Sequence, residues 1–311
     1  MKIIKTIATV MIGFLISLIL IRATDIWSSG MWHFKKSFLK EHDPALLRKV
    51  FKEELKENYT GDIEKDFDSF LISLIMEEIN KKEAENLRIY NAFVSEEEMS
   101  AYQESGIQEA GKIYGESINE NIYYIHITKF HKKESFKNLQ KYIPEMKNHE
   151  NIIIDLRDNT GGHFDSLKEI SNLFLTENEF VYAHIKKNGK VIEEYYSKGE
   201  KEFDFFNVVI LTNENTASVS ELFILILKNH LDNVYVIGTP TRGKGVVWSI
   251  SRFKDGSGYR FISDIMVGPE GSQIPEGGII PDIIIEDEEK QLKEAIDYIN
   301  SIMTQGGNPS V

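Results

Sequence analysis

The pattern of apolar and polar residues changes near residue 118. Before this point, residues 31–117 are rich in Glu, Lys and Leu, and their apolar positions recur every three or four residues, as in amphipathic helices. After it, short apolar runs of strand length alternate with amphipathic stretches of helix length. We therefore expect a helical region over residues 31–117 and a separate core region over residues 118–311.

The core region predicts strands and helices in alternation. Apolar runs predict strands at residues 122–127, 152–156, 180–185, 191–196, 208–211, 234–237, 246–250 and 259–265. Amphipathic or longer apolar stretches predict helices at residues 136–146, 167–175, 220–227 and 288–303. Turn sequences at residues 188–189 and 255–258 predict two hairpins. This order predicts an α/β fold, with a mixed sheet core, helices on its faces and added hairpins.

Residues 1–30 have the pattern of an export signal or a membrane anchor. Lys2 and Lys5 precede an uncharged, mostly apolar run over residues 6–21, which Arg22 closes. This run is longer than most signal cores, and no A-x-A cleavage site follows it. We expect an uncleaved single-pass anchor that places the core region outside the cytoplasm. If the signal is cleaved instead, the protein is secreted.

Composition excludes several kinds of chemistry. The chain of 311 residues has a formal net charge of −13, which argues against a nucleic-acid binder. It has no cysteine, so disulfides, thiol nucleophiles and thiolate metal sites are excluded. Its eight histidines are scattered and show no HExxH spacing, so we expect neither a metal ion nor any other cofactor.

Three loops that follow predicted strands are rich in small and polar residues, at residues 155–162, 213–221 and 238–245. Ligands of open α/β sheets bind at the carboxyl ends of the strands, so these loops are candidates to converge. In the second loop, Ser218 and Glu221 fit a capping box at the start of a helix. A serine at such a turn can also act as a nucleophile, because amides at the helix start bind a developing oxyanion.

A serine nucleophile requires a base, and the sequence offers two. One is His163, which follows the glycine pair of the first loop. The other is Lys244, which lies between two glycines, 26 residues after Ser218. Lysine can accept a proton if burial or a neighbouring cation lowers its pKa. Each feature taken alone is also compatible with an ordinary turn or helix cap.

Taken together, the loops resemble those of the C-terminal processing proteases, also called tail-specific proteases, which use a Ser–Lys dyad. The matching stretches are IIIDLRDNTGG, VVILTNENTASVSELF, VIGTPTRGKG, the DGSG hairpin and GPEGSQIPEGGIIPDI. The resemblance covers about residues 118–300. It implies that Ser218 is the nucleophile and Lys244 the general base, and that the amides of Val219 and of Gly161 or Gly162 bind the oxyanion.

The chain departs from the pattern of this family at supporting positions. Trp248 stands where the family usually has a Gln, Asn229 where it often has an Asp, and Arg242 where it usually has an aromatic residue. The first two changes are expected to weaken the positioning of the lysine, whereas Arg242 is expected to lower its pKa. No PDZ-like pattern precedes the core region, so capture of substrate tails by a PDZ groove is not expected.

The sequence therefore predicts an extracytoplasmic, membrane-anchored serine endopeptidase that cleaves polypeptide substrates. Two alternatives stay open. The first is a catalytically weak or inactive module that binds a ligand or peptide on the same scaffold. The second is an interaction protein that acts through the helical region.

Overall fold

The computed structural model describes residues 92–100, 111–186, 189–252 and 258–304. These residues form two compact units, each described here by itself. The expected anchor over residues 1–30 and most of the helical region over residues 31–117 lie outside the described residues. In the described part of that region, residues 92–94 and 113–117 are strand and not helix, so the prediction was wrong there, and the core sheet begins before residue 118 because its edge strand pairs with the next strand. Among the helices that the structure does describe, none is long and apolar enough to cross a membrane.

The smaller unit contains strand β1 (Ala92–Val94), which pairs antiparallel with the start of β10 (Gly258–Val267). In this register Ala92 lies opposite Arg260. Residues 96–100 follow β1 and are helical.

The larger unit is built on a six-stranded sheet with the order β11-β8-β7-β4-β3-β2. Five of the strands run parallel, and β2 pairs antiparallel with β3, which confirms the predicted mixed sheet. The strands are β2 (Ile113–Asn119), β3 (Ile122–Ile127), β4 (Asn151–Asp155), β7 (Asn207–Thr212), β8 (Val234–Gly238) and β11 (Ile283–Ile284).

The predicted hairpins form a second sheet. Strand β5 (Phe180–Ile185) pairs antiparallel with β6 (Val191–Tyr196), and Gly189 in the intervening turn has a φ of 82° that favours glycine. Strand β9 (Val246–Arg252) pairs with β10, whose C-terminal residues also pair with β5. The helix expected at residues 136–146 is instead two short helices, because Pro144, in the first turn of the second one, has no N–H to continue the first.

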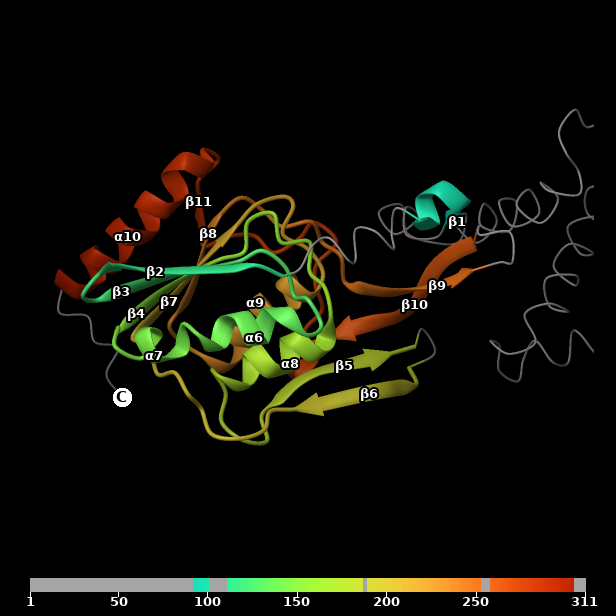
Figure 1. The fold of residues 1–311 in the computed structure, drawn as a ribbon, viewed down its shortest axis with the longest axis horizontal. Helices are drawn as coiled ribbons and strands as arrows, with labels where there is room; N and C mark the ends of the chain where they lie inside the picture. The colour runs from blue at the N-terminus through green and yellow to red at the C-terminus, as the bar shows by residue number, and fades with distance from the viewer. Residues whose placement is uncertain (1–91, 101–110, 187–188, 253–257, 305–311) are drawn as a thin grey trace, which may run out of the picture. The chain divides into compact units, whose positions relative to one another are not determined.

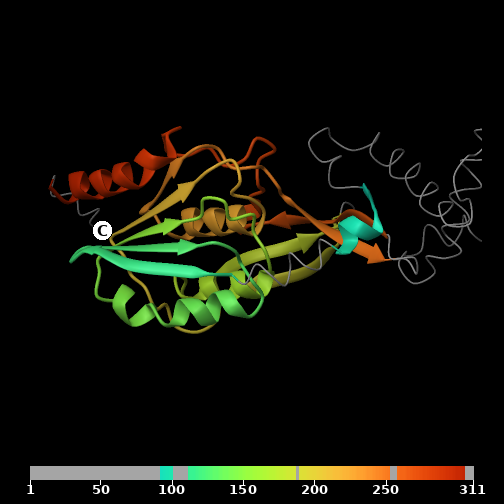
Figure 2. The same ribbon diagram turned by 45° about the horizontal axis from the view of Figure 1, so that its top comes forward.

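Helices cover both faces of the six-stranded sheet, as predicted (Figures 1 and 2). One face carries α9, with α6, α7 and α8 on the same side, and the opposite face carries α10. The bounds are α6 (Glu134–Gln140), α7 (Ile143–Met146), α8 (Phe164–Asn172), α9 (Val219–His230), α10 (Glu288–Thr304) and a single 3-10 turn, η2 (Pro269–Gly271).

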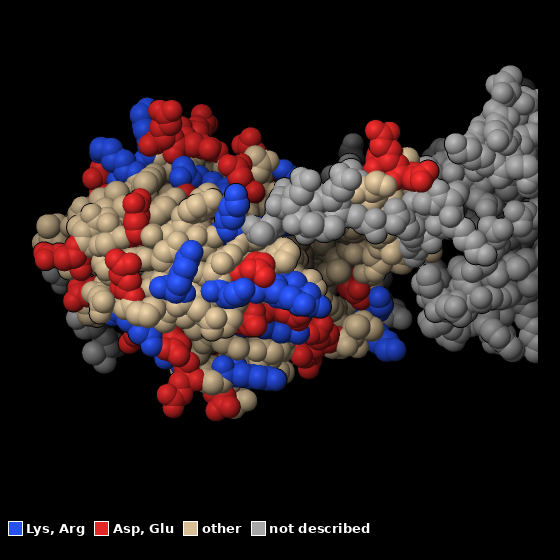
Figure 3. All heavy atoms as spheres, in the orientation of Figure 1, with Lys and Arg blue, Asp and Glu red and all other residues tan. Residues whose placement is uncertain are grey.

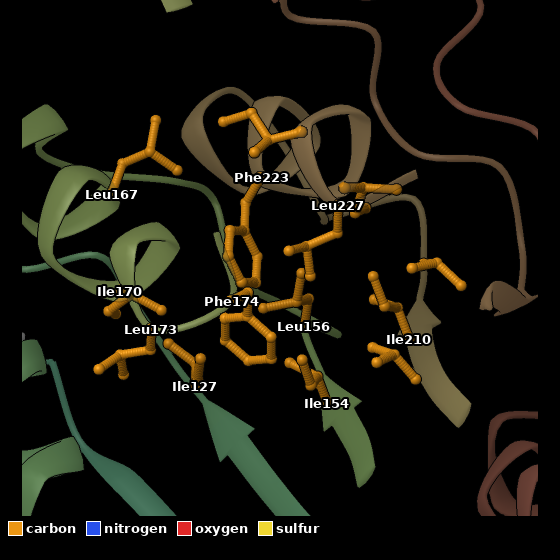
Figure 4. Close-up of a cluster of buried hydrophobic side chains, with 14 of the residues drawn as sticks. Ile127, Ile154, Leu156, Leu167, Ile170, Leu173, Phe174, Ile210, Phe223 and Leu227 are labelled. Atoms are coloured by element: carbon orange, nitrogen blue, oxygen red, sulfur yellow. The ribbon is translucent and has the colours of Figure 1, made fainter. Parts of the chain in front are cut away.

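The continuous apolar runs of the central strands arise because both faces of the sheet are covered. In β4, Ile152 and Ile154 pack toward α8 and α9, whereas Ile153 packs toward α10. Figure 4 shows the first of these layers, in which Phe223 of α9 and Phe174 lie between the helices and the sheet. These two layers fix the strands whose carboxyl ends carry the three polar loops.

Charged side chains contribute little to this core. Lys and Arg are interspersed with Asp and Glu on the face shown in Figure 3. Ion pairs of the larger unit include Lys132 with Asp165 at 3.5 Å, with both side chains about half exposed. Such exposed pairs typically contribute about 0.2–1 kcal/mol. The stability of the larger unit therefore depends mainly on its apolar layers.

Candidate active site

The three polar loops meet at the carboxyl ends of β4, β7 and β8, as the sequence predicts. The N–H of Ala217 donates to the carbonyl of Asn159 at 3.0 Å and joins the first loop to the second. The N–H of Arg242 donates to the carbonyl of Thr216 at 3.0 Å and joins the second loop to the third. Residues 155–162, 213–221 and 238–245 thus form one site.

Ser218 occupies the sharp turn between β7 and α9. It is the N-cap of α9, and Glu221 is the third residue of the helix, as the capping-box pattern predicts. Its φ of 61° and ψ of −119° are unfavourable for a residue with a side chain. A serine held in this way on a strand-to-helix turn is the arrangement that exposes a nucleophilic hydroxyl in hydrolases. Ser218 is half-buried, so its surroundings remain partly open to solvent.

The carboxylate of Glu221 is fully buried and binds both the second and the third loop. Its Oε2 accepts the N–H of Ser218 at 2.6 Å and the N–H of Lys244 at 2.9 Å. Its Oε1 accepts the hydroxyl of Thr241 at 2.6 Å and the N–H of Gly243 at 2.6 Å. One side chain therefore receives four donors, and three of them come from the loop that carries the candidate base.

This shared oxygen brings the two predicted catalytic residues together. Because the amides of Ser218 and Lys244 bind the same atom, their nitrogens lie within 5.5 Å of each other although 26 residues separate them. The capping-box pattern revealed the bond from Glu221 to Ser218. It contained no signal for the bonds to the third loop, because these depend on the arrangement of β7 and β8.

The glycine pair of the first loop contacts the turn at Ser218. A Cβ on Gly161 would lie 2.9 Å from the Cβ of Ser218 and 2.9 Å from the nitrogen of Val219, closer than a side chain allows. The N–H of Gly161 already donates to Oδ1 of Asn159 at 3.0 Å. Gly162 lies beside Phe130, with which it forms a parallel bridge. The N–H of Val219, the first of α9, has no acceptor within its own helix.

Asn159 holds the first loop in place, although the sequence did not single it out. Its buried side chain donates to the carbonyl of Ile127 at 2.7 Å and accepts the N–H of Gly161. Its carbonyl accepts the Ala217 N–H and the hydroxyl of Ser220. Its position before Thr160, Gly161 and Gly162 was the only available signal, since Asn is common in turns.

Asp155 and Arg157 of the same loop form a buried ion pair rather than part of the reactive centre. Arg157 Nη2 lies 2.6 Å from Asp155 Oδ2, and the hydroxyl of Tyr124 donates to that oxygen at 2.7 Å. Burial, and then the charge of Asp155, raise the pKa of Tyr124, which keeps its phenol protonated. Arg157 also donates to the carbonyl of Glu288 at 2.7 Å, which ties this loop to α10.

The predicted supporting residues occupy different places. Lys244 Nζ lies 4.9 Å from the ring centroid of Trp248, so Trp248 is at the site. Arg242 is exposed, and its guanidinium donates to Oδ1 of Asn215 at 2.7 Å. Asn229 is exposed near the end of α9, about 16 Å along the helix from Ser218, so the structure does not bring it into the site.

The alternative base His163 is the N-cap of α8. Its Nδ1 accepts the N–H of Asp165 at 3.3 Å, which leaves only Nε2 available to other groups. Burial lowers the pKa of His163, partly offset by the charge of Asp165. Its imidazole is therefore neutral at pH 7 and tied to its own helix.

Comparison with known proteins shows to which family this chain belongs. Residues 121–285, more than half of the chain, match the sequence profile of peptidase family S41. The chain belongs to peptidase family S41. This membership confirms the resemblance to the C-terminal processing proteases that the five sequence motifs indicated. It also places the chain in a family of serine-type peptidases.

Relatives of this S41 chain include proteins named "Probable CtpA-like serine protease". The one from Staphylococcus saprophyticus is 35% identical over 136 residues, which cover 44% of this chain and 28% of the relative. The one from Staphylococcus aureus is 36% identical over 137 residues, which cover 43% of this chain and 27% of the relative. The matches thus span little more than a quarter of the length of these relatives.

A solved structure shows the same fold over most of the S41 chain. A lipoprotein from Streptococcus agalactiae aligns with a TM-score of 0.58 and covers 93% of this chain and 96% of its own. Its sequence identity is 19%, so this likeness concerns the fold alone.

The Glu221 carboxylate provides a test of the site's architecture. In Glu221→Gln, an amide NH₂ replaces one oxygen and faces two donors, so at least one buried N–H or O–H loses its acceptor. We expect the free energy of unfolding to fall by about 1–3 kcal/mol in urea titrations. Glu214→Gln, at an exposed position of the same loop, is the matched control and should change it by less than about 0.5 kcal/mol. Equal stability of the two variants would show that Glu221 does not hold the loops together.

Proposed function

We propose that this chain is a serine endopeptidase in which Ser218 is the nucleophile and Lys244 the general base. Ser218 Oγ attacks the carbonyl carbon of a peptide bond while neutral Lys244 Nζ accepts the hydroxyl proton. Lys244 then returns this proton to the leaving amine as the C–N bond breaks, which leaves an acyl-enzyme. A water molecule, deprotonated in the same way, attacks the ester and releases Ser218.

The observation that carries the proposal is the shared bond of Ser218 and Lys244 to Glu221. A catalytic dyad requires two side chains held at fixed separation, and here one buried oxygen binds both backbones. The positive φ of Ser218 adds support, because such strain persists where the surrounding structure holds it and is concentrated at active sites.

Two backbone amides bind the oxyanion of the tetrahedral intermediate. Val219 supplies the first N–H of α9, where the helix dipole favours negative charge. Gly162 supplies the other, because the N–H of Gly161 is bonded to Asn159. Removing one such donor typically lowers the rate about 10²–10³-fold, so these amides are as necessary as the dyad.

Single substitutions of the dyad test the proposed reaction. Ser218→Ala removes the nucleophile and Lys244→Met removes the base, so each should lower cleavage of an unfolded protein substrate by about 10³-fold or more. Ser218→Ala should also abolish labelling by a serine-reactive phosphonate. The control is Lys228→Met, because Lys228 pairs with Asp282 at 2.7 Å near the far end of α9. A chain whose cleavage survives both dyad substitutions is not the proposed enzyme, and binding without any cleavage supports the ligand-binding alternative.

The proposed base also sets the pH dependence. A lysine must lose its proton before it can accept one, so kcat/KM should rise with pH and be lost at acid pH. A histidine base would act at lower pH than a lysine base, and burial lowers the pKa of His163 further. We expect His163→Ala to leave the pH profile unchanged. Activity that persists at pH 5 and disappears in His163→Ala would assign the base to His163 instead.

We further propose that residues 1–30 anchor the chain and that the peptidase acts outside the cytoplasm. The uncharged run at residues 6–21 behind two lysines supports this topology. An added protease should therefore digest the core region in cells whose outer layers have been removed but whose cytoplasmic membrane is intact. A core region that resists digestion until the membrane is lysed would place it in the cytoplasm.

A further inference from the structure

The indole of Trp248 lies against the amine of Lys244. Lys244 Nζ is 4.9 Å from the centroid of the Trp248 ring, within the distance of about 6 Å at which a cation is attracted to an aromatic face. Tryptophan has the strongest such face among the aromatic side chains. Trp248 belongs to β9, which pairs with β10, so its backbone is held by a sheet. The indole therefore offers the lysine a fixed surface.

The position of the Lys244 amine depends on its side chain as well as on its backbone. Glu221 binds the backbone N–H of Lys244, which fixes where the side chain starts. A lysine side chain also carries about 2 kcal/mol of rotamer entropy, which opposes holding its amine in one place.

We propose that Trp248 is a positioning residue for the catalytic lysine, whose amine it holds by a cation–π contact. This inference rests on the proposed function, in which Lys244 is the base. Glu221 fixes where the lysine backbone lies, and Trp248 fixes where its amine lies. Both constraints are needed because the reaction requires the amine, and not only the backbone, to stay near Ser218.

The same contact has a consequence for charge. The aromatic face attracts the ammonium form more strongly than the neutral amine, so it favours the protonated resting state of Lys244. The Glu221 carboxylate, which binds the Lys244 N–H, acts in the same direction. The cationic Arg242, two residues before Lys244, acts in the opposite direction, although its guanidinium is exposed and donates to Asn215. Removing the indole should therefore disorder the amine and also let it lose its proton at lower pH.

Trp248→Leu and Trp248→Phe separate these effects. Leucine keeps an apolar side chain but has no aromatic face, and phenylalanine keeps an aromatic face that attracts cations less strongly than that of tryptophan. In the Leu variant we expect kcat to fall about 2–30-fold and the acid limb of the pH profile to move down by about 0.4–1.5 pH units. The Phe variant should lie between Leu and the natural chain. Tyr196→Leu, at an exposed aromatic residue of β6, is the control and should change neither quantity.

A readout independent of activity uses the full chain with ¹³C-labelled lysine in a Ser218→Ala background. The ε-carbon signal of Lys244, identified by its loss in Lys244→Met, should be shifted upfield by the indole ring current. It should return to the range of the other lysines in Trp248→Leu and keep part of the shift in Trp248→Phe.

The two measurements distinguish the possible failures. If the natural chain is active and the Trp248→Leu variant keeps both its kcat and the acid limb of its pH profile, the positioning role alone is overturned. A Lys244 signal that is identical in the natural and Leu sequences would overturn the contact itself. If the natural chain is inactive but the Lys244 signal keeps its ring-current shift, the contact exists and the proposed peptidase function is wrong. The contact then has no role in catalysis.

Discussion

The arrangement of the site depends on one buried carboxylate. Glu221 is surrounded by four donors from two loops and contacts no solvent. A buried charge is costly unless hydrogen bonds satisfy it, and here the bonds that satisfy it also join the two loops. The loop of Lys244 therefore cannot move away from Ser218 without leaving a negative charge in the interior. The same interaction thus holds the two loops together and sets the separation of Ser218 and Lys244.

The strain at Ser218 is compatible with this constraint. Residues with unfavourable backbone angles persist only where the surroundings hold them, and the turn at Ser218 is held from three directions. Glu221 binds its N–H, Gly161 packs against it, and Asn159 binds the residue before it. These contacts also account for the small residues of the first loop, because a side chain on Gly161 would collide with the turn.

Two positions that differ from the family pattern lie in very different surroundings. Trp248 and Asn229 both differ from the usual residues of the C-terminal processing proteases, but their surroundings are not equivalent. Trp248 lies against the Lys244 amine, so its identity bears directly on the proposed base. Asn229 is exposed at the far end of α9, where many residues fit. An apolar aromatic partner also treats the two charge states of a lysine differently, because it attracts the ammonium more strongly than the neutral amine.

The sequence by itself determined the features that depend on neighbours along the chain. Apolar runs at residues 152–156 and 208–211 fixed two buried strands, and Ser218 with Glu221 fixed the start of α9, because strand alternation and helix capping are local patterns. Only the tertiary structure decided that Glu221 also binds the loop of Lys244 and that Asn159 of the first loop binds Ala217 of the second. These contacts depend on which strands are neighbours and in what register, and no local pattern in the sequence records that pairing.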